Sequence, residues 1–426
     1  MASSKITLPS VLLLAFAALY QYQLRDILFN TLGISRKIQP ISDFPYTCRR
    51  IENDPALQAC EDMWLDQSSR QLFLACSDPL SRKYWMPNIH RLNASGRGLN
   101  DHIVAMDIDK PTSSGSFSCR VLKTPNFPGV AGDGRLNVVG ITGKPSRDSS
   151  TVKLFLVNAR PSVDAQTGEL LDNEVVGGNA TVEVFEAGPD ATTLKHIHTF
   201  ADTQIATPNN IAPTDEGGFY FTNDHGLHKI GWKHHLSPFL LTGDVSYCPP
   251  PNAHQRCRLV TSGFGFPNGL LLASDGLIYI PSALTGGITV LQPQPSSTNG
   301  AAAKQIHFIN LDYPIDNLHE DAEGAIFAAT MPRVLEGLAA FNDPLNIART
   351  PSAAVHRVRR VRTTPQDENE YVYEVTKVIE DAKGEALPGA TTAVHDAKTG
   401  RLFISGKFFT RGTWTMSELD LCYAHC

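Results

Sequence analysis

Residues 66–76, DQSSRQLFLAC, join a polar turn to a short apolar strand, and this arrangement recurs along the chain. Five further copies begin at Asp148, Asp215, Asp275, Asp321 and Asp396. An aspartate in such a turn bonds the backbone two residues on, and a glycine supplies the positive φ that a hairpin needs. Each copy therefore predicts a β-hairpin.

The intervals between successive copies are long enough to hold four strands each. Alternating apolar segments at 103–108, 181–185 and 371–375 supply candidate outer strands. Six four-stranded units arranged radially around a channel leave few exposed sheet edges. The sequence thus predicts an all-β, six-bladed β-propeller forming a single domain over residues 40–426. Two unrelated β-sandwich domains are the alternative.

Composition agrees with a folded β protein. Hydrophobic residues make up 42% of the 426 residues and charged residues only 19%, so the chain can bury a large core. The net charge of -6 leaves no long basic stripe to neutralise phosphates. Nucleic acid is therefore not expected as a partner.

The N-terminus carries an apolar run, Ile6 to Tyr20, after Lys5, which is typical of a secretory leader. We expect residues 1–30 to be a signal peptide or a retained signal anchor, which would associate the protein with a membrane. At about 15 residues the run is short for a bilayer span. Sequons at Asn93 and Asn179 predict glycosylation in the secretory pathway. The propeller would then be secreted, or anchored on the luminal or extracellular side.

Eight cysteines agree with an oxidising compartment but allow 105 pairings. Cys248 and Cys257 flank a proline-rich loop and are expected to close it. A bridge between Cys48 and Cys422 would join the first and last blades of a propeller. Cys76 lies in an apolar strand and is interpreted as a buried thiol.

Oxygen-bearing side chains stand before four of the turns, where a buried strand should be apolar. They are Glu61, Asp62, Asn209, Asn210, Asn268, Asp316 and Asn317. Equivalent places in the blades would point them all into the central channel, where burial is costly unless a cation satisfies them. Calcium takes six to eight oxygen ligands, whereas zinc prefers histidine or cysteine. The pattern predicts a calcium-binding channel.

At these residues the sequence resembles the serum paraoxonase and arylesterase family. The matching stretches are Glu61-Asp62, Gly140-Ile141, residues 208–211, 221–225 and 266–269, and Ile315-Asp316-Asn317. The resemblance implies a six-bladed propeller with two calcium ions in its channel, one catalytic and one structural, and a bridge between Cys48 and Cys422.

The resemblance also assigns ligands to the two ions. For the catalytic ion it implies Glu61, Asn209, Asn268, Asp316 and Asn317. For the structural ion it implies Asp62, Asn210 and the carbonyl of Ile141. The family has an aspartate at the position of Asn210, so one negative charge is missing in this chain.

The chain departs from the family at the histidine pair proposed to move protons above the metal. Val139 and Ala159 stand at those positions, and neither can carry a proton. His225 matches another family histidine and is a candidate substitute, although a packed or solvated loop histidine is the alternative interpretation. Glu61 and Asp316 are further candidates to assist proton transfer.

These observations predict a calcium-dependent hydrolase of lactones or aryl esters of small apolar molecules, in which the metal polarises the carbonyl. No Gly-x-Ser-x-Gly nucleophile motif occurs. Because the histidine pair is missing, the second hypothesis is a non-hydrolytic enzyme, such as a hetero-Diels-Alder or other cyclase. This hypothesis rests on analogy with paraoxonase-like propellers of fungal natural-product pathways and implies a role in secondary metabolism. A calcium-stabilised binding protein is the third.

Overall fold

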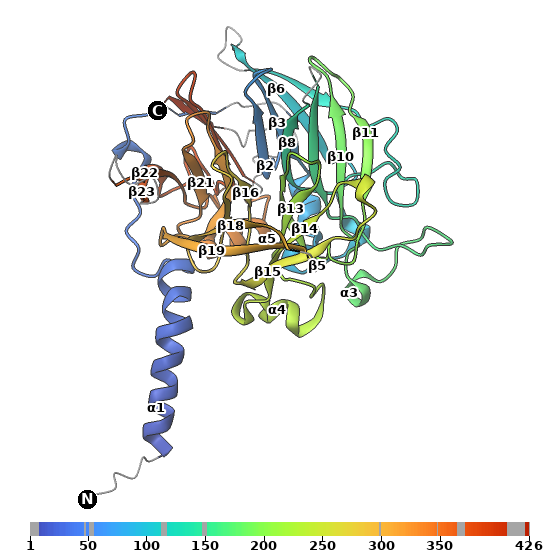
Figure 1. The fold of residues 1–426 in the computed structure, drawn as a ribbon. Coiled ribbons are helices and arrows are strands. Elements are labelled where there is room, and N and C mark those ends of the chain that lie inside the picture. Colours follow the sequence, from blue (N-terminus) through green and yellow to red (C-terminus); the bar gives the residue numbers. More distant parts are fainter. Residues whose placement is uncertain are drawn as a thin grey trace, which may run out of the picture.

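The computed structural model describes residues 8–46, 48–50, 55–111, 117–146, 151–297, 300–346, 348–363, 371–406 and 422–425. Its long-range strand pairs are antiparallel and build four-stranded sheets arranged around a common centre (Figure 1). Five sheets each come from one continuous segment of chain. In chain order, the first sheet contains β2 (Asp62–Asp66), β3 (Gln71–Cys76), β6 (His102–Pro111) and β7 (Phe117–Leu122), and the second contains β8 (Val138–Pro145), β9 (Val152–Asn158), β10 (Thr181–Ala187) and β11 (Lys195–Phe200). The third contains β12 (Pro208–Pro213), β13 (Phe219–Asn223), β14 (Gly243–Cys248) and β15 (Arg258–Phe264), and the fourth contains β16 (Leu271–Leu272), β17 (Ile278–Pro281), β18 (Gly287–Ser297) and β19 (Gly300–Asn310). The fifth contains β20 (Ile315–Glu320), β21 (Ile326–Thr330), β22 (Ala353–Arg362) and β23 (Tyr371–Asp381).

The remaining four-stranded sheet is assembled from both ends of the chain. It has the order β1 (Arg49–Arg50), β26 (Cys422–His425), β25 (Arg401–Ser405) and β24 (Thr392–Asp396). The predicted all-β propeller is confirmed. The predicted number of six blades needs correction to five blades that are continuous segments. The sixth four-stranded sheet forms only where the two ends of the chain pair.

The repeated aspartates occupy the same turn, between the first two strands of their sheets. Asp275 Oδ1 accepts the Leu277 N–H at 3.0 Å, and Asp321 Oδ1 accepts the Glu323 N–H at 2.9 Å. The following glycines Gly276 and Gly324 have φ of 76° and 79°, the left-handed values that such hairpins require. Asp148 lies outside the described residues, but β8 and β9 flank it as predicted.

The apolar strand residues pack between neighbouring blades. Phe73 and Ile103 of one blade, for example, belong to the same buried cluster as Leu154 and Phe185 of the next. This face-to-face packing leaves the inner strands β2, β8, β12, β16, β20 and β24 around the central channel.

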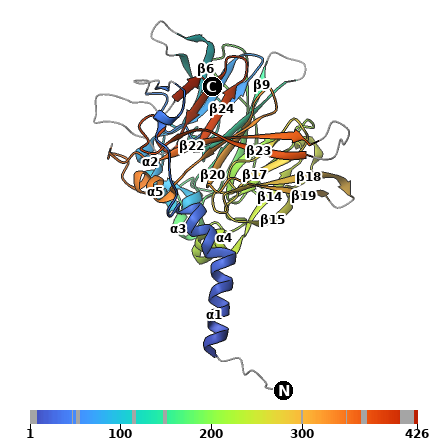
Figure 2. The same cartoon turned by 90° about the vertical axis from the view of Figure 1, so that its left-hand side faces the viewer.

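The helices are short and peripheral. They are α1 (Leu8–Leu19), α2 (Pro79–Arg82), α3 (Asn173–Val176), α4 (Gly231–Leu240) and α5 (Val334–Asn342), with π-helical turns at Tyr20–Leu24 and Ile27–Thr31, 3₁₀ turns at Ile41–Asp43, Pro87–Ile89, Ala94–Gly96 and Pro251–Ala253, and a small hairpin of β4 (Trp85–Met86) and β5 (Arg91–Leu92). Both views show α1 projecting from the end of the propeller where α3 and α4 lie (Figures 1 and 2). Among the described helices, none is both long and apolar enough to cross a membrane.

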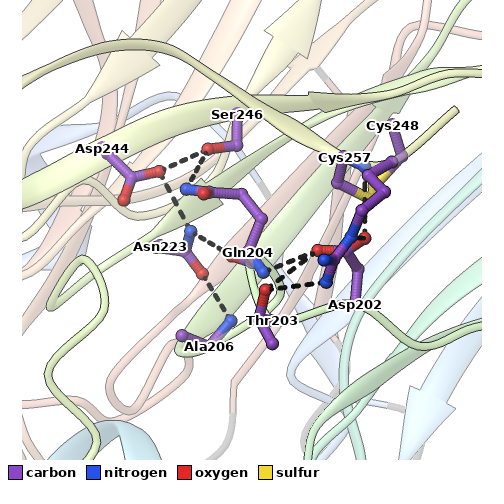
Figure 3. The surroundings of a disulfide bond; sticks show 10 residues. Asp202, Thr203, Gln204, Ala206, Asn223, Asp244, Ser246, Cys248 and Cys257 are labelled. Carbon is purple, nitrogen blue, oxygen red and sulfur yellow. Dashed lines mark hydrogen bonds and ion pairs between the residues drawn. A yellow bond between two sulfur atoms is a disulfide. The ribbon is translucent and has the colours of Figure 1, made fainter.

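Two disulfides are described. Cys248 and Cys257 are bonded, which confirms the predicted loop closure (Figure 3). The interpretation of Cys76 as a buried free thiol is wrong. Cys76 forms a disulfide with Cys60 at the open end of the β2–β3 hairpin. Cys48 is also disulfide-bonded. Its pairing with Cys422, whose side chain lies outside the description, stays a prediction, although Arg50 pairs with Cys422 between β1 and β26.

Candidate functional site

The predicted ligand positions coincide with β-bulges on the inner strands. The strand register shifts between Val138 and Ile141, between Pro208 and Ile211, and between Ile315 and Leu318. Each shift leaves two residues opposite one residue of the neighbouring strand, which bends the strand and re-aims its side chains. Asn209, Asn210, Asp316 and Asn317 all stand in these bulges.

Contacts between blades bring these bulges together. Asn210 Nδ2 donates to Asn317 Oδ1 at 2.8 Å, and Asn317 Nδ2 donates to the Glu61 carbonyl at 3.3 Å. The backbone N–H of Gly269 donates to the Asp316 carbonyl at 3.2 Å. A Cβ at Gly269 would lie 2.6 Å from the Asn317 Cα, so only glycine allows this approach.

Every predicted ligand is buried, from 0% exposed at Asp62 and Asp316 to 4% exposed at Asn209. They form two groups. The first group is here named the helix-end set and consists of Glu61, Asn209, Asn268 and Asp316. Within it, Glu61 contacts Arg82 of α2, and Asn209 contacts Asp224. Asp62, Asn210 and Asn317 lie one residue further along each strand, toward the turns. The structure therefore brings the predicted residues together, with the two groups at successive positions along the inner strands.

Glu61 is held by an arginine that the sequence did not reveal. Arg82 Nη1 lies 2.6 Å from Glu61 Oε2, and Arg82 Nη2 donates to the Val138 carbonyl at 3.2 Å. Asp101 lies beside the same guanidinium, and complete burial raises the pKa of its carboxyl above the usual value. Arg82 gave no sequence signal, because a lone arginine in a short helix matches no motif.

Asn268 provides the test of whether an ion fits the helix-end set. Its Oδ1 is buried and, within the described part of the chain, has no hydrogen-bond partner. An oxygen left bare in this way is expected of a metal ligand, since buried acceptors are otherwise satisfied. No three His, Cys, Asp or Glu residues in the described ranges could hold an ion. A calcium would therefore depend on amide oxygens together with Glu61 and Asp316, which is the donor set calcium accepts.

His225 is a packed residue and not a solvated one. The residue is 4% exposed, and its Nδ1 lies 2.7 Å from Asp224 Oδ1. The other Asp224 oxygen accepts from Asn209 Nδ2 at 3.3 Å, so one carboxylate links the histidine to the helix-end set. The His225 ring stacks on His234 at 3.8 Å. Burial, reinforced by His225, lowers the pKa of His234 to about 4, so His234 is neutral at neutral pH.

The positions of the missing histidine pair are apolar and closed. Val139 and Ala159 are both buried in one hydrophobic cluster. The Trp85 indole N–H donates to the Ala159 carbonyl at 2.6 Å, which fixes the β4–β5 hairpin over this end of the channel. Neighbouring Met86 packs with Met331 and Phe341. The wall of the helix-end set is therefore apolar and carries no proton donor at these two positions.

A cavity of about 620 Å³ opens at the other end of the channel, near the turns. Inner strands and turn residues line it, including Trp64, Ile141, Asn210, His319 and Glu320. Burial raises the pKa of Glu320, which accepts two hydrogen bonds from Ser274. Its lining includes Asn210 and His319, but neither Arg82 nor any residue of the β4–β5 hairpin.

The fold and this buried cluster define a β-propeller protein with a polar site in its channel. The Arylesterase family model matches residues 173–415, and the chain belongs to that family. The matched range includes Asn209, Asn268 and Asp316 but begins after Glu61, Asp62 and Ile141.

The chain is also similar to serum paraoxonases. The chain is 27% identical to serum paraoxonase/arylesterase 1 of Mus musculus over 230 residues, 51% of this chain and 60% of the mouse protein. It is 25% identical to serum paraoxonase/arylesterase 2 of Gallus gallus over 269 residues, 62% of this chain and 65% of the chicken protein. The alignment with the first of these relatives thus spans about 60% of its length.

Solved structures resemble the chain more distantly. A gluconolactonase of Xanthomonas campestris has a TM-score of 0.45 and 12% identity, covering 92% of this chain and 98% of the other. A luciferin-regenerating enzyme has a TM-score of 0.45 and 9% identity, covering 89% and 95%. At these scores the likenesses bear on neither activity nor substrate.

Proposed function

We propose that the protein is a calcium-dependent hydrolase of lactones or aryl esters of small, apolar molecules. Membership of the arylesterase family supports an esterase-like activity. The bare, buried Oδ1 of Asn268 is the observation that carries the metal. The apolar wall formed by Val139, Ala159 and the β4–β5 hairpin favours apolar substrates.

In this proposal Glu61, Asn209, Asn268 and Asp316 hold one calcium ion, with Asn317 at their border. The ion, when bound, would polarise the substrate carbonyl and stabilise negative charge on its oxygen. Arg82 holds Glu61 in place and adds a fixed positive charge next to the site. The Trp85 hairpin excludes bulk water, which strengthens these electrostatic interactions.

His225 is the residue we propose as general base. Asp224 fixes its Nδ1, as a base-orienting carboxylate does in other hydrolases. The opposite ring nitrogen would take a proton from the attacking water and return it to the leaving oxygen. Glu61 already accepts from Arg82, which makes it a less available proton acceptor than His225. Asp316 remains a further candidate.

One specific observation favours a second function. Val139 and Ala159 leave the family's relay positions without any proton carrier, and a reaction that needs none, such as a cyclisation, would be compatible with that wall. A calcium-stabilised binding protein is the third candidate. Only the hydrolase predicts turnover of simple esters.

A panel of lactones and phenyl esters tests the proposal, with the wild type compared with Asn268→Ala. We expect hydrolysis that is lost on chelation, restored by calcium, and reduced at least 100-fold in the variant. Asn173→Ala is the matched control, because Asn173 is equally buried but bonds Ser162 far from the channel. Hydrolysis that persists in both chelator and Asn268→Ala would refute the metal-centred mechanism.

The secretory location is part of the proposal. The two described disulfides support an oxidising compartment. Asn93 and Asn179 are both exposed, as glycan acceptors must be. Peptide-N-glycosidase treatment of the protein from a eukaryotic host should lower its mass at both sequons. An unchanged mass would contradict their use.

A further inference from the structure

Asp62 is a carboxylate whose acceptor capacity is filled by protein groups. Its Oδ1 accepts from Met63 N (2.9 Å), His319 Nε2 (3.0 Å) and Thr392 Oγ1 (3.1 Å), and its Oδ2 from Asn210 Nδ2 (3.0 Å) and Ile141 N (3.1 Å). A carboxylate offers about four lone-pair sites, so five donors leave none bare. Asp62 with these five donors is named the Asp62 hub.

The orientation of the Asn210 amide is determined by its neighbours. Its Nδ2 lies between Asp62 Oδ2 and Asn317 Oδ1, at 3.0 and 2.8 Å, while its Oδ1 accepts the Ile211 N–H at 2.7 Å. The reverse orientation would place an oxygen against two oxygens and an NH₂ group against an N–H. Asn210 therefore presents hydrogens, not an oxygen, toward Asp62.

A calcium ion requires the opposite arrangement. It binds six to eight oxygens, each of which must keep a lone pair for the ion, and the five donors on Asp62 leave none. The three residues that the resemblance assigned to a structural ion, Asp62, Asn210 and Ile141, do not fit it. Ile141 contributes its N–H to Asp62, Asn210 contributes its NH₂, and His319 approaches the remaining oxygen.

We infer that the Asp62 hub is a metal-free substitute for the second ion, and that the channel takes one calcium ion. The donors satisfy a carboxylate that would be costly to bury without partners. They also join four blades, through β2, β8, β12 and β20, and reach a fifth through Thr392 of β24. This inference relies on the proposed function only for the position of the single ion.

Counting calcium on the purified chain tests the inference without any assay of activity. Equilibrium dialysis followed by elemental analysis should give one ion for each chain, and none in Asn268→Ala. Two ions on the wild type, or one ion that survives Asn268→Ala, would overturn the metal-free hub. A wild type with no calcium would leave the hub intact but would refute the metal in the proposed function, so the two failures are distinguishable.

A gain of binding provides the second test. Asn210→Asp places a carboxylate against Asp62, which should raise the count from one calcium to two and make the melting temperature increase with calcium. Asn223→Asp is the matched control, because Asn223 is equally buried and its Nδ2 donates to Asp244 at 3.0 Å (Figure 3). The Asn223→Asp protein should be less stable than the wild type and should bind no additional calcium ion. An Asn210→Asp protein that folds in calcium but binds only one ion would contradict the inference.

Discussion

Replacing Arg82 with methionine should destabilise the calcium-free protein by about 4 kcal/mol, because it removes the guanidinium that pairs with the buried Glu61. The two side chains are only 5% and 2% exposed and their charged atoms lie 2.6 Å apart. Removing one partner of such a pair typically costs about 3–5 kcal/mol. With an unfolding entropy of about 2.1 cal/mol/K per residue, about 4 kcal/mol lowers the melting temperature of 426 residues by roughly 5 °C.

Calcium should reduce this loss. An ion in the helix-end set supplies positive charge beside Glu61, so we expect the penalty of Arg82→Met to fall below about 2 kcal/mol in saturating calcium. Thermal and urea unfolding with and without calcium measure both values. Adding Glu61→Gln to Arg82→Met should recover part of the calcium-free loss, since position 61 then carries no buried negative charge.

Arg97→Met is the matched control, because the Arg97–Asp133 pair is 14% and 27% exposed and should contribute no more than about 1 kcal/mol. A free energy of unfolding for Arg82→Met within about 0.5 kcal/mol of the wild type would show that the Arg82–Glu61 pair does not stabilise the fold. A penalty of Arg82→Met that calcium leaves unchanged would show that no ion binds beside Glu61.

Three further predictions concern other parts of the molecule. Opening the 16-residue Cys60–Cys76 loop with serine at both positions should cost about 3 kcal/mol in urea unfolding, and unchanged stability would argue against the bond. Burial raises the pKa of Asp244 to about 6 in the folded state, so its contribution to stability falls as pH rises from about 4 to 6. Asp244→Asn should therefore be more stable than wild type at pH 8, on the order of 1–3 kcal/mol, but not at pH 4, and equal differences at both pH values would contradict this. His225→Gln should lower kcat/KM by about 10²–10⁴-fold while calcium binding persists, and a smaller effect would exclude His225 as the base.

The turns and the polar strand positions were predictable because their chemistry is local. An aspartate bonding two residues on requires no knowledge of the rest of the fold. Polar residues five to seven positions before the turn indicated the channel, and the bulges that hold Asn209 and Asp316 lie in that interval. The Cys60–Cys76 bond is also consistent with local hairpin geometry. A hairpin that pairs Asp66 with Gln71 brings position 61 opposite Cys76, so Cys60, the next residue, lies close to Cys76.

The remaining features depend on tertiary neighbours that no local pattern encodes. Arg82 reaches Glu61 from a four-residue helix 21 positions further along the chain. The direction of the Asn210 amide is decided by Asp62 and Asn317, which come from other blades. An asparagine at a ligand position therefore looked like an oxygen donor from the sequence, whereas the structure uses its hydrogens.

A calcium site in the channel is tested most directly by the rate of ester or lactone hydrolysis across calcium concentrations set with a chelating buffer. We expect the wild type to gain activity along a single saturable curve, one ion to bind over the same range, and Asn268→Ala to show neither. Hydrolysis that is equal at all calcium concentrations and unaffected by Asn268→Ala would contradict a calcium site in this channel.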